Sequence, residues 1–88
     1  MIERWTAGAA QDYRWFARQV PKTAARIDRL LAEIRRHPFT GIGKPEPLKG
    51  TLAGWWSRRI TTEHPLVYRV VGKGAARELQ IAQCRYHY

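Results

Sequence analysis

The chain has 88 residues, a length that fits one domain spanning residues 1–88, and its hydrophobic content of 44% excludes a disordered chain. It carries 16 Lys and Arg against 7 Asp and Glu, and its net charge of +9 favours a polyanionic or acidic protein partner, although a merely basic protein stays an alternative. Arginine outnumbers lysine twelve to four, and its planar, bidentate group tilts this choice toward nucleic acid.

Two helices are predicted in the first half of the chain, after a short strand at residues 1–5. Thr6 can cap a helix that runs to about Gln19. Pro21 suits the first turn of a second helix, which Pro38 ends. Both helices have apolar residues at helical spacing, so each is expected to face a common core: Ala9, Tyr13, Phe16 and Val20 in the first, and Ile27, Leu30, Leu31 and Ile34 in the second.

The second half of the chain predicts strands. Six glycines and prolines between residues 39 and 54 indicate a loop, with one short strand near Leu48. Three strand-like runs follow, the last two joined by a hairpin turn at residues 72–74: residues 55–61, 66–71 and 78–85. The layout is an α+β fold, in which an N-terminal strand and two helices pack on a mainly antiparallel sheet of four to five strands.

Cysteine and histidine content favour neither a disulfide nor a metal site. Cys84 is the only cysteine, which fits a reducing cytosol, and we expect it to be a small buried hydrophobe. With three scattered histidines it forms no known ligand spacing, so neither metal nor cofactor is expected. The N-terminus lacks the apolar core of a signal peptide and no run approaches the ~18 residues of a membrane span. A cytoplasmic protein without a membrane partner is predicted.

The first candidate catalytic group is Glu46. Pro45 and Pro47 fix their own φ angles and extend the residues before them, so Glu46 is held on a stiff segment. Stiffness pre-organises a general base. Taken alone, a surface carboxylate between helix-breaking prolines is the more common meaning of this pattern.

Two neighbouring arginines form the second candidate. Side chains alternate along a strand, so Arg58 and Arg59 face opposite ways, one at the core edge and one on the open sheet face. An arginine on that face beside an acidic loop can hold a phosphate, although a solvated strand charge is commoner. His64, before Pro65, is interpreted as a turn residue, and Tyr68 as a core residue.

The C-terminal tail is the third candidate. His87 suits a general acid near neutral pH, and the tyrosines on both sides of it can stack on unpaired bases. A frayed tail is the alternative. Together, these groups supply what RNA cleavage without a metal needs. The base takes the ribose 2′-OH proton, the arginine stabilises the transition state, and the acid protonates the leaving 5′ oxygen.

Four segments carry specific motifs: PFTGIGKPEPL at residues 38–48, GWWSRRI at 54–60, EHPLVY at 63–68 and RYHY at 85–88. In this order they resemble motifs of the Txe/YoeB toxins, a family of RelE-superfamily mRNA interferases. Together with the two helices, the resemblance spans essentially the whole chain. The pairing of GKPEPL with a terminal RYHY is its most specific part.

The resemblance implies a RelE-like microbial RNase fold and ribosome-dependent endoribonuclease cleavage of mRNA in the A site, which inhibits translation. It implies a YefM/Phd-type antitoxin, a homodimeric toxin, and contact with operator DNA only through the antitoxin. By position, Glu46 resembles the general base, His87 the general acid, Tyr88 the terminal aromatic residue and Arg59 a phosphate-side group. Four further residues are expected to contact nucleic acid: Lys44, Lys49, Arg58 and Arg85.

Pro65 departs from the family pattern, which usually has an arginine there. Losing one such donor commonly costs roughly 10²–10³ in rate, so either Arg59 holds the phosphate alone or the enzyme is slower. Two rival functions fit the same fold. One is a toxin that binds a protein target such as DNA gyrase without nuclease chemistry, and the other is an attenuated toxin that acts mainly by repressing its operon with the antitoxin.

Overall fold

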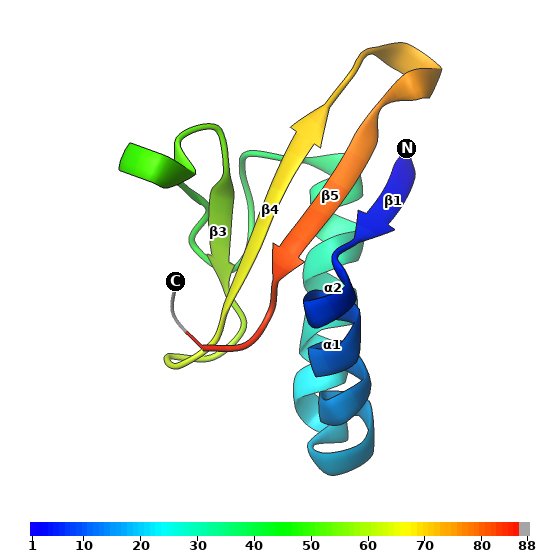
Figure 1. Ribbon diagram of the computed structural model, residues 1–88, viewed down its shortest axis with the longest axis vertical. Coiled ribbons are helices and arrows are strands. Elements are labelled where there is room, and N and C mark those ends of the chain that lie inside the picture. The colour runs from blue at the N-terminus through cyan, green and yellow to red at the C-terminus, as the bar shows by residue number, and fades with distance from the viewer. Residues whose placement is uncertain (87–88) are drawn as a thin grey trace.

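Two helices cover one face of a five-stranded mixed sheet in the computed structural model, which describes residues 1–86 (Figure 1). The elements follow in the order β1 (Ile2–Trp5), α1 (Ala7–Gln19), α2 (Pro21–Arg36), β2 (Glu46–Pro47), β3 (Trp56–Arg59), β4 (Pro65–Val71) and β5 (Glu78–Gln83). The strand order in the sheet is β1-β5-β4-β3-β2, with β1 parallel to β5 and every other pair antiparallel. The predicted α+β fold is confirmed.

The helix starts follow the local sequence signals. The Thr6 hydroxyl accepts a hydrogen bond from the Ala9 N–H at 3.1 Å and so caps α1. The same hydroxyl donates to the Ala82 carbonyl at 2.9 Å, which ties the start of α1 to β5. Pro21 is the first residue of α2, as predicted.

The core lies between the helices and one face of the sheet. The apolar stripe predicted for α2 is buried, and Ile27 and Leu30 are fully so. Burying a side chain of this size contributes about 1.5–3 kcal/mol. The central strands add alternate residues, of which the largest are Leu66, Tyr68, Leu79 and Ile81. Neither helix covers the other face, which is turned toward the viewer in Figure 1 with α2 behind the sheet. We call it the open face.

Several boundaries differ from the sequence prediction, and β3, for example, ends at Arg59 rather than at residue 61. The short strand predicted near Leu48 is β2, a two-residue edge strand paired with β3, and it includes Glu46, which was expected on the loop before it. The link between β4 and β5 spans residues 72–77 and contains a 3₁₀ turn, so it is longer than the predicted hairpin turn. The last strand ends at Gln83, because the chain then turns and the Cys84 thiol donates to the Ala9 carbonyl of α1 at 3.4 Å.

Cys84 is a buried free thiol, as predicted, and burial raises its pKa to about 12. Within residues 1–86, no three histidine, cysteine, aspartate or glutamate side chains gather closely enough to hold a metal ion. Neither α1 nor α2, the helices of this part of the chain, combines the length and apolarity that crossing a membrane requires.

Candidate active site on the open face

One row of side chains crosses the open face from β2 to β5. Strand pairing places Glu46 opposite Ser57, Ser57 opposite Val67, and Val67 opposite Gln83. Directly opposed residues share a face of a regular sheet, and the neighbours of Val67 along β4, Leu66 and Tyr68, belong to the core on the other face. The register of β4 with β5 shifts between Val67 and Tyr68, so Gln83 meets Val67 at a bulge in the ladder. We call this set the carboxylate row. It brings the exposed Glu46 onto the same surface as the end of β5.

Arg59 lies beside this row. It follows Ser57 by two residues, so its side chain points to the open face, and it is a diagonal neighbour of Glu46 at roughly 7–8 Å between Cα atoms. Its N–H donates to the Gly43 carbonyl at 2.6 Å, which holds the segment before Glu46 in place. Among residues 1–86, its exposed guanidinium has no hydrogen-bond or ion-pair partner. It is therefore available to a phosphate.

Gly43 permits this close approach. Its φ of +84° belongs to the region that favours glycine, and a Cβ there would lie 2.8 Å from Leu30 Cδ2 and 3.1 Å from Arg58 Cβ. A side chain at this position would therefore push the segment away from β3. The glycine lets the main chain that leads to Glu46 run directly against Arg59.

Arg58 corrects a prediction. It was expected to contact nucleic acid, but it is 0% exposed and lies on the core side of β3. Its Nε donates to the Tyr68 hydroxyl at 3.1 Å, and Tyr68 in turn donates to the Pro38 carbonyl. Its terminal nitrogens donate to three main-chain carbonyls at 2.6–3.0 Å: His37, Thr40 and Ile42. Arg58 therefore binds the segment that joins α2 to β2, and Tyr68 is a core residue as predicted.

The other cations predicted to contact nucleic acid are Lys44, Lys49 and Arg85. Lys44 precedes β2 and Lys49 follows it in the sequence, and both are exposed. Their contact with RNA stays a prediction. The Arg85 guanidinium is turned toward α1, 3.8 Å from the centroid of the Trp15 ring and 3.8 Å from the Asp12 carboxylate. RNA contact by Arg85 also stays a prediction, and its present contacts link the tail to α1.

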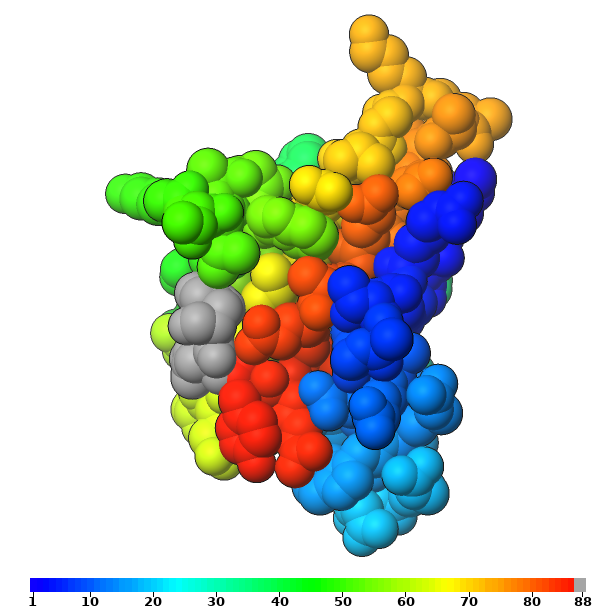
Figure 2. Space-filling model, viewed as in Figure 1, coloured from blue at the N-terminus to red at the C-terminus, as the bar shows by residue number. Residues whose placement is uncertain are grey.

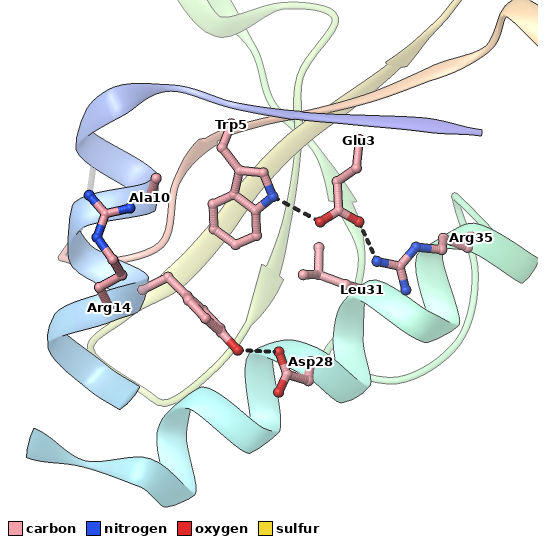
Figure 3. A pocket seen from close by; sticks show the side chains of 8 residues that line it. Glu3, Trp5, Ala10, Arg14, Asp28, Leu31 and Arg35 are labelled. Atoms are coloured by element: carbon pink, nitrogen blue, oxygen red, sulfur yellow. Dashed lines mark hydrogen bonds and ion pairs between the residues drawn. The ribbon is translucent and has the colours of Figure 1, made fainter. Parts of the chain in front are cut away.

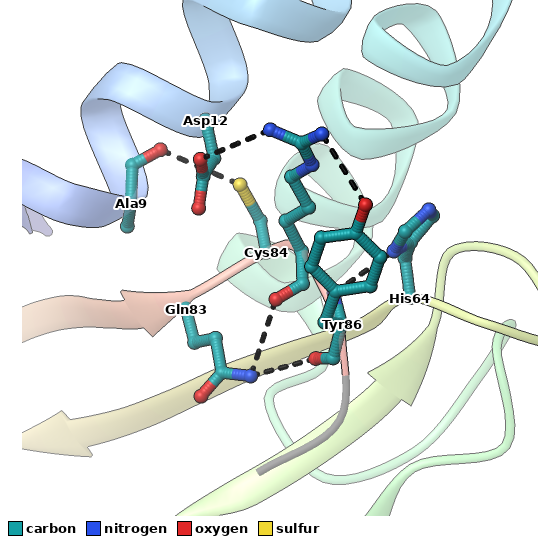
Figure 4. Close-up of polar contacts among 7 residues, drawn as sticks. Ala9, Asp12, His64, Gln83, Cys84 and Tyr86 are labelled. Carbon is teal, nitrogen blue, oxygen red and sulfur yellow. Dashed lines mark hydrogen bonds and ion pairs between the residues drawn. The ribbon is translucent and has the colours of Figure 1, made fainter.

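The turn after β5 is held by His64 and Gln83, which we call the tail clamp (Figure 4). His64 Nδ1 accepts a hydrogen bond from the Tyr86 N–H at 2.9 Å. Gln83 Nε2 donates to the Tyr86 carbonyl at 2.6 Å and to the Arg85 carbonyl at 3.3 Å. Tyr86 has a φ of +61°, which is uncommon for a residue with a side chain and needs such support.

The tail clamp binds both the N–H and the carbonyl of Tyr86. Tyr86 directly precedes His87, the predicted general acid, and Tyr88, the predicted terminal aromatic residue. His87 and Tyr88 lie outside the described residues. The His64 ring also meets the rings of Phe16 and Tyr86 edge-on, at 5.2 and 5.1 Å between centroids. His64 does lie between β3 and β4, as predicted, but its contact with Tyr86 was missed, since 22 residues separate the two. Figure 2 shows the red end of the described chain against α1 and against the yellow-green connection that carries His64.

A hollow of about 560 Å³ lies elsewhere, between β1, α1 and α2 (Figure 3). Glu3 accepts a hydrogen bond from Trp5 Nε1 at 2.8 Å and pairs with Arg35. The Tyr13 hydroxyl donates to Asp28 at 2.6 Å, and this bond raises the pKa of Tyr13 to about 12. These groups are paired with one another, so the hollow supplies no free acid or base to the carboxylate row.

Two helices on one face of a small mixed sheet, with Glu46 and Arg59 exposed on the other face, define a small α+β domain. YafQ from Escherichia coli shares this fold at a TM-score of 0.76, although only 14% of the sequence is identical. A family model described as "YoeB-like toxin of bacterial type II toxin-antitoxin system" matches residues 5–88. The chain belongs to this family of toxins of type II toxin–antitoxin systems, as the sequence motifs indicated.

Named relatives agree with this assignment. The chain is 53% identical to "Toxin YoeB" of Synechocystis over 88% of its length and 85% of the relative. It is 46% identical to "Toxin YoeB" of Escherichia coli K12 over 96% of its length and 95% of the relative. The solved "YoeB/ParE toxin from Agrobacterium tumefaciens" superposes over the full length of both chains with a TM-score of 0.95 and 48% identity.

Proposed function

We propose that this toxin is an endoribonuclease that cleaves mRNA in the ribosomal A site without a metal ion. One observation supports this most directly. The carboxylate row joins Glu46, beside a free Arg59, to Gln83, which holds the turn that leads to His87. A base, a phosphate ligand and the segment before an acid therefore lie on one face.

In the proposed reaction, Glu46 takes the proton of the ribose 2′-OH, and the 2′ oxygen attacks the adjacent phosphorus. The guanidinium of Arg59 stabilises the charge that develops on the phosphoryl oxygens. The bond from phosphorus to the 5′ oxygen breaks, and His87 protonates that oxygen. The products are a 2′,3′-cyclic phosphate and a 5′-hydroxyl. The roles of His87 and Tyr88 rest on the family resemblance.

Partners are proposed from the relatives. One solved relative is described as "YoeB dimer from Staphylococcus aureus" and another as "YoeB-YefM complex from Staphylococcus aureus", each 40% identical to this chain. We infer that this toxin is likewise a homodimer in the cytoplasm and binds a YefM/Phd-type antitoxin. Its net charge of +9 suits an acidic antitoxin segment, and operator DNA would be contacted only through the antitoxin.

The test uses purified toxin and ribosomes programmed with a defined mRNA. We expect a cut in the A-site codon with a cyclic phosphate at the upstream end. Glu46→Gln should lower the rate by roughly 10²–10⁴, the range for losing a general base. Glu63→Gln, which changes an exposed carboxylate between β3 and β4, is the matched control and should cleave normally. Uncut mRNA would favour a protein target, and normal cleavage by Glu46→Gln would remove its role as base.

A further inference from the structure

A second row of side chains crosses the open face beside the carboxylate row. Strand pairing places Arg4 opposite Gln80, and Gln80 opposite Arg69. The last member of the row is Trp55, the residue before β3. The Arg69 guanidinium lies over the Trp55 ring, 4.3 Å from its centroid. We call these four residues the arginine–tryptophan row. Arg69 follows Val67 of the carboxylate row by two residues, so the rows are about 6.6 Å apart along the strand.

Arg69 is held in place while most of its donors stay free. Its Nε donates to Gln80 Oε1 at 2.6 Å, and the Gln80 amide donates to Glu78 at 3.1 Å. Its two terminal amino groups have no hydrogen-bond partner in the part of the chain that the structure describes. A guanidinium held over an indole, with terminal amino groups that no described residue occupies, can stack on a base and bind a phosphate oxygen.

The space above this row suits a ligand of nucleotide size. A hollow of about 300 Å³ is lined by the row together with Trp5, Thr6 and Ile81. It lies on the open face, which Figure 2 shows from the front, where β1, β5 and β4 follow one another across the surface. Glu78 on β5 pairs with Arg4 at 3.1 Å and accepts a hydrogen bond from Gln80, so this carboxylate contacts the row at Arg4 and Gln80 and not at Trp55. A phosphate is therefore best placed at the Arg69 end, nearest Arg59.

We propose that Trp55 and Arg69 form a nucleotide-binding subsite for the substrate RNA strand. The subsite holds the nucleotide next to the one whose 2′-OH faces Glu46, because the carboxylate row lies between Arg69 and the level of Arg59. The base of this nucleotide lies against the Arg69–Trp55 pair, and its phosphate lies at the terminal amino groups of Arg69. Arg59 pairs with Pro65, four residues before Arg69 on β4, so about 13 Å along the strands separates the levels of the two arginines. Purines are favoured because they present the larger stacking surface. The subsite deepens the proposed function, and it rests on that function for the identity of the strand.

Binding of a short single-stranded RNA that carries a 2′-deoxynucleotide at the cleavage position tests the subsite without catalysis. Arg69→Gln and Trp55→Ala should each weaken binding by roughly tenfold, the scale of one base–aromatic stack. Arg29→Gln removes the same charge from an exposed site on α2 and is the matched control. Trp55→Phe keeps a ring, so it should retain most of the affinity even if Trp55→Ala lowers the melting temperature. An Arg69→Gln effect no larger than that of Arg29→Gln would overturn the proposal.

Cleavage assays on ribosomes programmed with defined messages test whether the RNA bound at this row is the mRNA or ribosomal RNA. With wild-type toxin, messages with a purine beside the cut should be cleaved faster than messages with a pyrimidine, and Arg69→Gln should remove that preference. A loss of ribosome affinity that is equal for every message would assign the row to ribosomal RNA and overturn the proposal. Failure of the wild type to cleave any message would reject the proposed function alone, since oligonucleotide binding is measured without cleavage.

Discussion

The two faces of the sheet use arginine in opposite ways. On the covered face, Arg58 is fully buried and donates to three main-chain carbonyls and to Tyr68. On the open face, Arg59 and Arg69 keep terminal donors that no group in residues 1–86 occupies. A buried guanidinium that makes four hydrogen bonds stabilises the fold, whereas an exposed one whose terminal donors are not occupied can bind a ligand. Arg58 therefore stabilises the fold, whereas its neighbour Arg59 is the residue proposed to bind a phosphate.

The largest expected effect on stability comes from Arg58→Ala. Removing the buried guanidinium leaves three carbonyls and the Tyr68 hydroxyl without that partner, so the free energy of unfolding should fall by about 3–5 kcal/mol. Urea unfolding followed by circular dichroism measures the loss, with Arg29→Ala on the exposed surface of α2 as control. Equal stability of the two variants would remove the distinction between the faces.

The next largest effect is expected at the tail clamp. His64→Ala removes the acceptor of the Tyr86 N–H, and the resulting misplacement should lower single-turnover cleavage by roughly ten- to a hundredfold. His64→Asn places an amide oxygen close to the position of Nδ1 and should restore most of the rate. RNA affinity should change little, and the melting temperature should fall by a similar amount in both variants, because both lose the ring contacts with Phe16 and Tyr86. If the asparagine variant is as slow as the alanine variant, the hydrogen bond does not position the tail.

A smaller effect is expected from Pro65→Arg, which restores the residue usual in the family. Pro65 lies directly opposite Arg59, so the change places two positive charges opposite each other on neighbouring strands. Removing the proline also raises the conformational entropy of the unfolded chain. The free energy of unfolding should fall by about 1 kcal/mol, while cleavage should stay near the wild-type rate if Arg59 holds the phosphate as proposed. A large gain in rate, together with a mild defect in Arg59→Ala, would show that the missing arginine limits the enzyme.

The last effect concerns the pH dependence of stability at Cys84 and is absent at neutral pH. Burial raises the pKa of its thiol from 9.0 to about 12, so the native state holds this proton where the unfolded state releases it. The stabilising contribution is complete below pH 9.0 and is lost as the pH rises toward about 12. Cys84→Ala should therefore show a flatter decline of the free energy of unfolding with pH in this window. Parallel curves for the two proteins would contradict the effect of burial on the thiol.

The elements that were predicted from sequence are those with local signals. Thr6 and Pro21 mark the helix starts, and the apolar stripe of α2 marks its buried face, because each signal acts within a few residues. Alternation along β3 correctly put Arg58 and Arg59 on opposite faces. It could not tell which one was buried, because the carbonyls that receive Arg58 belong to a segment 16–21 residues away.

The contacts that organise the open face depend on long-range pairing. The arginine–tryptophan row requires β1 to pair in parallel with β5, which joins Ile2 to Glu78. The tail clamp requires His64 and Tyr86 to meet across two strands. Neither pairing leaves a local pattern in the sequence, so motif resemblance could indicate Glu46 and Arg59 but not the surface around them.

Single-turnover cleavage by Arg59→Ala on programmed ribosomes tests the central claim, that the open face carries the chemistry. Arg59 is exposed, so the free energy of unfolding should stay within about 0.5 kcal/mol of wild type. The cleavage rate should fall by roughly 10²–10³ through loss of the donor for the developing phosphoryl charge. A stable Arg59→Ala protein that cleaves at the wild-type rate would contradict the account.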